Sequence, residues 1–406
     1  MAVYRLGDRV HDSEHEGWPQ LMRKAYAEQM RPVCQCLVHD QRRSMYIAFV
    51  GGQHVLKRLP YSGSQHAPHC DHYEPPQALS GLGQVSGSAI RENPATQSTT
   101  LMLDFALTKG KSRAIGIASE VEHESVRSDG TKLTMRGLLH YLLDQAGMTR
   151  WMPAMQGKRS WFVVRRELLN AAAEKTTKGR SLSEILYVPE PFVLERAQEI
   201  KQRQLAALAS LSLANSRLIL IGEIKGIDPA RYGKSLVIKH MPDLKLMMND
   251  DLHKRFTSQF EHQLQLWGQL DTSHLLLIAT VSRTAQGVHA IEAACALNVN
   301  DAWIAFETLS EWELLSELLH ARRRFTKGLR YNMPKDKPLA CAVLHDTGPE
   351  PTALYLVPQD GGGPYEDAVK ALETETGMTS WRWNVGVQTM PDLPPQVVTH
   401  RASAHH

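Results

Sequence analysis

The chain has 406 residues, of which 22% are charged and 42% are hydrophobic, and its formal net charge is +3. This length and composition predict two or three domains with hydrophobic cores of their own. Because no apolar run is as long as a membrane span and no signal peptide is evident, we expect a soluble, cytoplasmic protein with reduced thiols.

Two short cysteine and histidine clusters flank a predicted β-hairpin near the N-terminus. The strand-like runs 45–50 and 53–59 are separated by Gly51-Gly52, which is typical of a tight turn. A hairpin brings its two open ends together, so the two clusters should meet. We predict a structural zinc site, because zinc takes four sulfur or nitrogen ligands in a closed tetrahedron. Its ligands would be Cys34, Cys36, His66 and Cys70.

Other interpretations of these clusters remain open at this point. His39, His69 and His72 are close enough in sequence to replace a ligand. The residues could also cluster by chance, or the thiols could form a disulfide, although disulfides are rare in the cytosol. Cys295 and Cys341 lie in apolar runs and are expected to be core residues. We assign residues 1–73 to a zinc-binding hairpin module.

A segment poor in large apolar residues follows the clusters. Residues 74–100 are rich in Ser, Gly, Pro and Gln, which predicts a linker or a long surface loop. Residues 101–107 read as a strand and begin a mixed region, 101–215. Within it, residues 131–180 hold ten Lys or Arg against three Asp or Glu, a local charge of +7. Such an excess on a nearly neutral chain predicts a surface that faces a polyanion.

The basic segment is predicted to be helical. Thr134 should cap a helix over 135–145, a second helix should run from about 160 to 175, and residues 182–187 form a short helix or strand. This order is compatible with a helix-turn-helix or winged-helix module. The candidate phosphate contacts are Lys158, Arg159, Arg165 and Arg166. The alternative is a helical region whose basic residues only solvate its outer face.

The next region, 216–300, contains a possible nuclease half-site. After a predicted long helix over 192–211, a buried-type strand leads into Glu223-Ile224-Lys225, where Glu223 could hold Mg²⁺ and Lys225 could orient water. A catalytic site would need a second carboxylate, and Asp104, far away in sequence, is the only candidate. A returning strand over 235–239, a helix from Asp250 or Asp251 to Trp267, and strands 274–281 and 288–297 complete this α+β region.

The C-terminal region, 301–406, is predicted as helix 310–323, strands 339–344 and 353–357, helix 365–375 and a last strand at 381–383. This order resembles the restriction-endonuclease-like fold. Cys341, Tyr355 and Val357 stand where that fold carries its metal-binding residues, so a degenerate, non-catalytic domain is implied. A second basic patch is predicted here from Arg322, Arg323, Arg324, Lys327 and Arg330.

Several segments together resemble the bacterial domain of unknown function 1173. They are Arg31-Pro32, the His66 and Cys70 cluster, residues 137–142, Glu223-Ile224-Lys225, residues 324–332 and Asp346-Thr347. The resemblance covers nearly the whole chain. That family is carried on plasmids and integrative conjugative elements, so the resemblance implies an accessory protein of mobile DNA without assigning an activity.

Taken together, the sequence predicts an α+β multidomain protein with a zinc-stapled hairpin, a basic helical centre and a degenerate nuclease-like C-terminus. The function expected is that of a zinc-containing, nucleic-acid-binding accessory protein, with DNA and possibly other mobile-element proteins as partners. The alternatives are a Mg²⁺-dependent nuclease and a non-catalytic protein-interaction scaffold.

Overall fold

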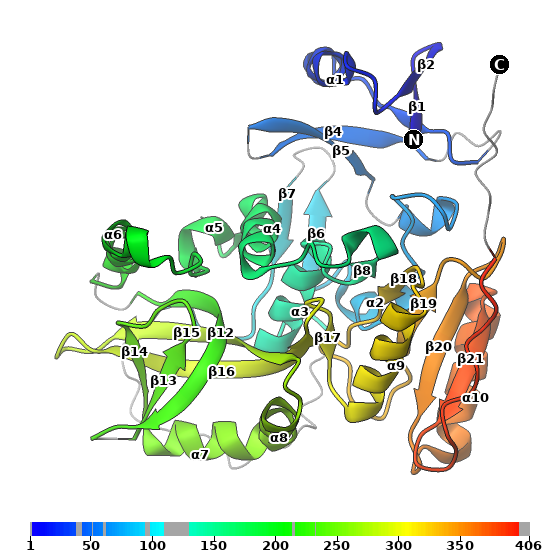
Figure 1. Cartoon of the computed structure of the whole chain (residues 1–406). Helices are drawn as coiled ribbons and strands as arrows, with labels where there is room; N and C mark the ends of the chain where they lie inside the picture. The colour runs from blue at the N-terminus through cyan, green and yellow to red at the C-terminus, as the bar shows by residue number, and fades with distance from the viewer. Residues whose placement is uncertain are drawn as a thin grey trace.

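The computed structural model describes residues 2–37, 43–50, 52–59, 62–93, 98–108, 130–212, 216–231 and 233–397. In this part of the chain, helices are interspersed among five sheets (Figure 1). The architecture is therefore mixed α and β, as the sequence predicts. Every helix in the described ranges is too short or too polar to cross a membrane.

The N-terminal residues form two small sheets and one helix. Strands β1 (Val3–Leu6), β2 (Arg9–Asp12) and β3 (Val33–Cys34) make the sheet β2-β1-β3. Strands β4 (Met45–Val50) and β5 (Gln53–Arg58) pair antiparallel, as the Gly-Gly spacing predicts. Helix α1 (Trp18–Ala27) buries Met22 and Ala25 against Leu6 and Ile47. These elements lie together at one end of the molecule (Figure 1).

Within the predicted linker, residues 74–93 and 98–100 are part of the folded body, which corrects that prediction. They contain a 3-10 turn (Gln77–Leu79), helix α2 (Leu82–Val85), strand β6 (Ile90–Asn93) and most of β7 (Ser98–Leu101). The large apolar residues here are few, but Leu79, Val85 and Ile90 are all buried. Strands β6 and β7 join β9 (Lys175–Thr177) and β10 (Arg180–Ser181) in the sheet β10-β9-β7-β6.

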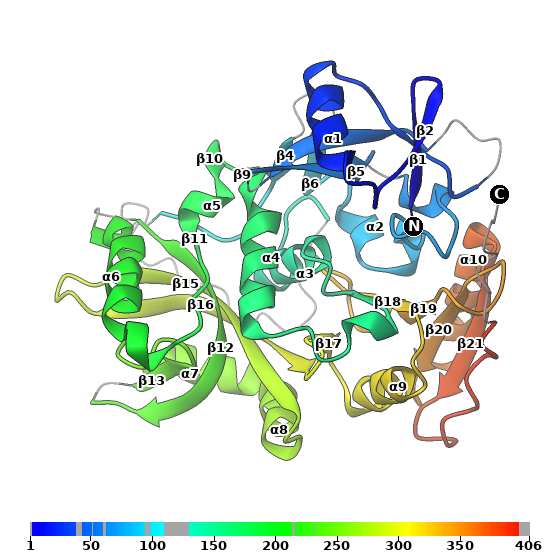
Figure 2. The ribbon, with the colours of Figure 1, turned by 45° about the horizontal axis from the view of Figure 1, so that its top comes forward.

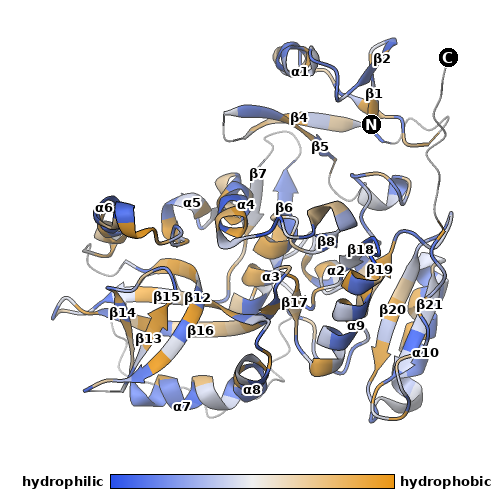
Figure 3. Ribbon diagram, viewed as in Figure 1, coloured by the Kyte–Doolittle hydropathy of each residue, from blue (hydrophilic) through white to orange (hydrophobic). Residues whose placement is uncertain are grey.

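Helix α3 (Met135–Gln145) lies at the centre of the molecule. Thr134 caps it, since its Oγ1 accepts a hydrogen bond from the Gly137 N–H at 3.0 Å. Every residue from Gly137 to Leu143 is buried, because α4 (Trp161–Ala173) and a long β-sheet cover α3. The hydropathy colouring shows α3 and the sheet strands beside it as mainly apolar (Figure 3). A helix so enclosed offers no face to a polyanion.

The long β-sheet closes on itself. Strands β12 (Leu218–Pro229), β13 (Lys234–Ile238), β14 (Lys245–Met248), β16 (His289–Asn300) and β15 (Ser273–Arg283) follow one another, and β15 pairs again with β12. The result is a five-stranded barrel. Strand β11 (Leu186–Tyr187) also pairs with β12, and strand β17 (Ala305–Phe306) also pairs with β16.

Helices surround this barrel. Helix α5 (Leu182–Ile185) precedes β11, and α6 (Ala197–Leu208) is shorter than the predicted helix over 192–211. The predicted helix through Trp267 is two helices, α7 (Asp250–Gln259) and α8 (Glu261–Gln269), which meet at Phe260. Its cap is Asn249, which accepts from the Leu252 N–H at 2.8 Å, and neither aspartate has this role.

The C-terminal sheet has the order β21-β20-β19-β18-β8. Its strands are β21 (Thr379–Asn384), β20 (Thr352–Val357), β19 (Ala340–Leu344), β18 (Phe325–Lys327) and β8 (Arg150–Trp151). Helices α9 (Leu309–His320) and α10 (Gly362–Thr376) pack beside it. One hydrophobic core extends from Val85 to Tyr331, so it crosses the boundaries expected at 215/216 and 300/301.

Candidate metal centre

Four cysteine and histidine side chains converge beside the N-terminal hairpin. Cys34 ends β3, Cys36 follows it, and His66 and Cys70 lie in the loop after β5. Their ligand atoms all lie within 4.8 Å of one another. The Cys34 and Cys70 Sγ atoms are 3.7 Å apart, and His66 Nδ1 is 3.6 Å from Cys36 Sγ. The hairpin therefore brings the two clusters together, and the four residues can hold a metal ion.

Backbone and side-chain donors surround the sulfur atoms of this cluster. The backbone N–H groups of Ala67 and His72 each lie 3.4 Å from a sulfur, that of Cys36 and that of Cys70 respectively. Hydrogen bonding from Cys34, followed by that from Cys70, lowers the pKa of Cys36. The hydrogen bond to Cys36 is also the largest cause that raises the pKa of Cys34 to about 11. Ionisation of Cys36 thus depends on hydrogen bonds from the other two thiols.

The substitute ligands named from the sequence do not belong to this group. His72 Nε2 lies 2.6 Å from the Tyr4 hydroxyl, and burial lowers the His72 pKa to about 4. His69 is exposed and contributes only its carbonyl oxygen to a contact with Arg324. His39 lies outside the described residues. The five cysteines are free thiols, so the structure contains no disulfide between them.

The loop that carries His66 and Cys70 docks on the C-terminal sheet. Arg150 of β8 donates to the Asp71 carbonyl at 3.0 Å and to the Glu74 carboxylate at 2.6 Å. The Tyr73 ring meets the His345 ring edge-on, with centroids 5.0 Å apart. Burial raises the pKa of Glu74, but the charges of Arg58 and Arg150 outweigh it and lower the pKa. The metal centre is therefore continuous with an interface between distant parts of the chain.

The predicted phosphate contacts divide into exposed and internal side chains. Lys158, Arg166 and Arg322 are exposed, while Arg165 and Arg324 are half-buried. Arg159 donates to the carbonyls of Met148 and Ala302, both at 3.0 Å, and burial lowers its pKa to about 10. The internal group, which is fixed by contacts within the protein, is Arg159, Arg323, Lys327 and Arg330.

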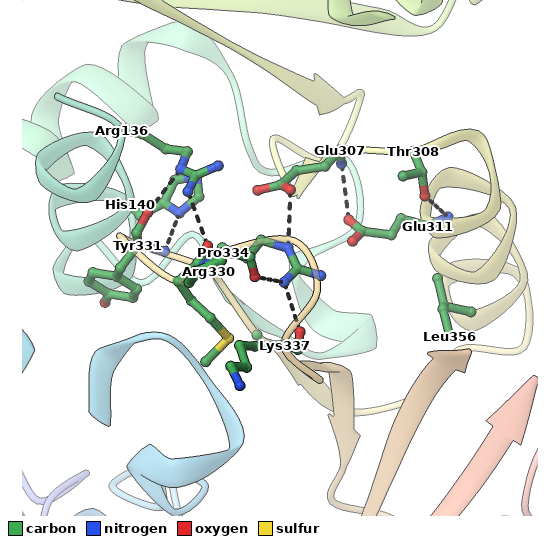
Figure 4. Close-up of polar contacts among 12 residues, drawn as sticks. Arg136, His140, Glu307, Thr308, Glu311, Arg330, Tyr331, Pro334, Lys337 and Leu356 are labelled. Atoms are coloured by element: carbon green, nitrogen blue, oxygen red, sulfur yellow. Dashed lines mark hydrogen bonds and ion pairs between the residues drawn. The ribbon is translucent and has the colours of Figure 1, made fainter. Parts of the chain in front are cut away.

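Three cations of the arginine-rich segment 322–332 are held in internal ion pairs, which corrects the predicted second basic patch for Arg323, Lys327 and Arg330 but not for the exposed Arg322. Arg323 is 3% exposed and forms a two-nitrogen pair with Asp346, with the shortest contact at 2.8 Å. Lys327 Nζ lies 3.3 Å from Glu311, and Arg330 lies 3.4 Å from Glu307. Figure 4 shows Arg330 between Glu307 and the Lys337 carbonyl. These cations are neutralised inside the protein, so they are unavailable to phosphate.

Helix α3 holds the same segment from the other side. His140 Nδ1 accepts the Tyr331 N–H at 2.9 Å, and Arg136 donates to the carbonyls of Tyr331 and Met333 (Figure 4). His140 is fully buried, and this burial lowers its pKa well below the usual value. The residues 137–142 and 324–332 that stand out in the sequence therefore bind each other.

Glu223 and Lys225 do not form the expected pair. Glu223 is buried, and its Oε1 accepts from Lys239 Nζ and His274 Nδ1, each at 2.8 Å. Lys225 is exposed at a β-bulge between Ile224 and Gly226. In the described ranges, the Cys/His cluster is the one group of three or more potential ligands close enough to share a metal. The Mg²⁺ half-site is thus not assembled around Glu223.

Several polar residues that hold these contacts in place have no recognisable signal in the sequence. Arg150, His345, Lys239 and His274 act at contacts between segments distant in sequence. The three positions aligned with nuclease ligands, Cys341, Tyr355 and Val357, are all buried in the apolar core. They offer no surface for a metal-dependent reaction.

The chain belongs to the family described as a protein of unknown function, DUF1173, whose model matches residues 4–386. This match confirms the resemblance noted from the sequence. No curated protein and no solved structure matches the chain.

Proposed function

We propose that the protein is a zinc-containing, nucleic-acid-binding accessory protein in which zinc has a structural role. Three thiols and one imidazole from two short clusters form a donor set typical of closed, four-coordinate zinc sites. Cys34 is buried and His66 is 2% exposed, which is typical of ligands in a closed structural site. When bound, zinc would tie β3 to the loop after β5, and these four side chains would hold it.

The observation that carries nucleic-acid binding is the outer face of α4. Phe162, Arg166 and Asn170 are exposed at successive i, i+4 positions, and Lys158 precedes them. Phe162 is 58% exposed, which is unusual for a large aromatic side chain. An exposed aromatic residue beside basic residues suits contact with bases and phosphates.

The hairpin that follows α4 continues this basic surface. Strands β9 and β10 pair antiparallel around Lys178-Gly179, both of which have positive φ. Lys178 and Arg180 are exposed. A helix followed by a basic hairpin is the order of a winged-helix module, which supports α4 as the element that contacts nucleic acid. The enclosed α3 would support α4 from behind.

The C-terminal sheet would serve as a non-cutting platform. Its elements follow the order α9, β18, β19, β20, α10, β21, which is compatible with the degenerate nuclease-like fold expected from the sequence. We propose that the protein serves as an accessory protein of mobile DNA, with other element-encoded proteins as partners; the family match itself names no function. The protein would act in the cytoplasm.

Fluorescence anisotropy with a labelled duplex, measured across a salt series, tests the nucleic-acid proposal. The double variant Arg166→Glu, Lys178→Glu should weaken binding by about tenfold and reduce the salt slope, since two phosphate contacts are lost. The matched control is Lys254→Glu, an exposed residue on α7. Unchanged affinity in the double variant would remove α4 from the proposal, and no binding at low salt would overturn it.

Metal analysis of the purified protein tests zinc separately. One equivalent of zinc is expected, and its removal by a chelator should destabilise the N-terminal elements. A protein purified without metal, and unchanged in stability when zinc is added, would contradict the zinc site.

A further inference from the structure

The closed barrel has a specific strand order. If β12, β13, β14, β15 and β16 are numbered one to five, the order around the barrel is 1-2-3-5-4-1. Strands three and five, β14 and β16, are parallel, and the other neighbours are antiparallel. Helices α7 and α8 connect strands three and four and lie at one end of the barrel (Figure 1). This is the topology of an OB-fold.

The first strand also has the shape that such a barrel requires. The half from Leu218 to Glu223 pairs with β15, and the half from Ile224 onward pairs with β13. The change of partner coincides with the bulge at Lys225, which bends the strand. Strand β12 can thus close the barrel, because its two halves pair with different neighbouring strands.

We propose that the outer face of β12, β13 and β14 binds single-stranded nucleic acid through its phosphate backbone. This inference rests on the proposed nucleic-acid-binding function and adds a second surface to α4. OB-folds bind oligonucleotides or oligosaccharides on strands two and three and on the loops between strands one and two and between four and five. The residues on this face decide between those two ligand classes.

The strand register identifies the residues on this face. Val237 lies opposite Gly226 on one side and Lys245 on the other, and Met247 follows Lys245 by two positions on the same face. The alternate positions, such as Leu236 and Leu246, are buried in the barrel. Val237 and Met247 are half-buried, so they form a shallow apolar floor. Gly226 leaves room for close approach, since a Cβ atom there would meet only the Asp228 side chain, at 3.8 Å.

Lysines surround that floor. Lys225 and Lys245 are exposed, and the half-buried Lys234 stands at the end of the barrel, where β13 begins. Within the described residues, none of the three forms an ion pair, in contrast to Lys239, which pairs with Glu223. Asp228 is the one acidic residue in the described parts of β12, β13 and β14 that accompanies them on this surface. Three lysines against one aspartate leave an excess of positive charge, which favours phosphate over a neutral oligosaccharide.

Two loops extend from the same side of the barrel. The β12–β13 and β15–β16 connections both project to the left in Figures 1 and 2. They turn at Gly233 and Gly287, with φ of +84° and +83°. The groove that an OB-fold uses lies between these loops, so a strand of nucleic acid could pass between them over the lysines. A duplex is too wide and stiff to follow such a shallow curved face.

Anisotropy with a labelled oligothymidylate of about 20 bases tests this inference, because that length exceeds the footprint of one OB-fold. The triple variant Lys225→Glu, Lys234→Glu, Lys245→Glu should bind it at least about tenfold more weakly. Loss of three phosphate contacts should lower the salt slope by about 2. Duplex binding, which we assign to α4, should be unchanged. The control is Lys254→Glu, Arg255→Glu on the exposed side of α7.

Photocrosslinking adds a readout that does not depend on a variant. An oligothymidylate that carries bromodeoxyuridine should crosslink to peptides within 225–247 of the wild-type protein. Full-strength binding by the triple variant, or crosslinks confined to other segments, would overturn the inference. Wild-type protein that binds duplex but not oligothymidylate would also overturn it while leaving the proposed function intact. Failure to bind either probe would reject the proposed function itself.

Discussion

The Cys/His cluster and the arginine-rich segment 322–332 both stand out in the sequence, but the structure treats them in opposite ways. The four candidate metal ligands converge mainly on each other, with sulfur and nitrogen atoms 3.6–3.7 Å apart. The cations of the arginine-rich segment instead meet carboxylates and carbonyls, such as Asp346 and Glu311. The comparison shows that residue type alone does not identify a site. The side chains must also have bonding capacity that the rest of the protein leaves unsatisfied.

Removal of a metal ligand should have the largest effect. In zinc-finger peptides bound zinc contributes about 10–16 kcal/mol at neutral pH, so Cys70→Ser should lose zinc and unfold the N-terminal elements. Zinc content and thermal melting measure this. Cys295→Ala, which alters a buried cysteine elsewhere, should retain its zinc. A full equivalent of zinc in Cys70→Ser would place the metal on other ligands.

Disruption of the buried ion pair between Arg323 and Asp346 should have the second largest effect. Loss of one partner leaves the other charge buried, so Arg323→Met should cost about 3–5 kcal/mol of unfolding free energy. Its neighbour Arg322 is exposed, and Arg322→Met should change stability by less than about 0.5 kcal/mol. Urea unfolding of both variants provides the measurement. Equal effects of the two substitutions would mean that Arg323 is not held by a stabilising internal ion pair.

Arg159 and Lys158 are neighbours in sequence, but Arg159 is an internal cation and Lys158 is exposed. Arg159 donates to several carbonyl groups and lies over the Trp151 ring, with its guanidinium carbon 5.3 Å from the centroid. Arg159→Met should therefore cost about 2–3 kcal/mol, because it removes several hydrogen bonds to carbonyl groups at once. Lys158→Met should be nearly neutral in stability and should affect only nucleic-acid binding. The reverse order in an unfolding experiment would contradict the division into internal and exposed cations.

The smallest expected effect is a pH dependence at the docked loop. Burial, followed by the charges of Arg324 and Arg150, lowers the His345 pKa from 6.5 to about 3. Between these values the unfolded chain binds more protons, so folding stability falls as pH decreases from 6.5 toward 3. The slope should reach about 1.4 kcal/mol per pH unit.

Urea unfolding near neutral pH and at about pH 5 measures this dependence. His345→Gln should show a shallower loss than the wild type, whereas the exposed His262→Gln should match the wild type. Equal pH dependence in all three proteins would mean that His345 is not held neutral.

Local patterns predicted the local structure well. The Gly-Gly turn between β4 and β5, the Thr134 cap of α3 and the strands β15 and β16 all follow from neighbouring residues. The four metal-ligating residues also follow from local spacing, because one hairpin joins them. These features depend on contacts within short stretches of chain.

Contacts between distant segments account for what the sequence did not predict. Closure of the barrel pairs β12 with β15, and the order of those strands has no signature in their apolar residues. In the same way, Arg323 and Lys327 look like surface cations in the sequence. Only the tertiary fold pairs them with Asp346 and Glu311. The supposed linker misled for a similar reason, since its few apolar residues are all placed inward.

The place of the docked loop in the sequence bears on the order in which parts of the chain can fold during synthesis. All four metal-ligating residues lie before residue 71, whereas Arg324 and His345 emerge from the ribosome far later. The cluster is thus complete before its docking surface has been translated. A metal captured at that stage would hold the loop in shape while the rest of the chain is made. The C-terminal sheet would then fold against a prepared template.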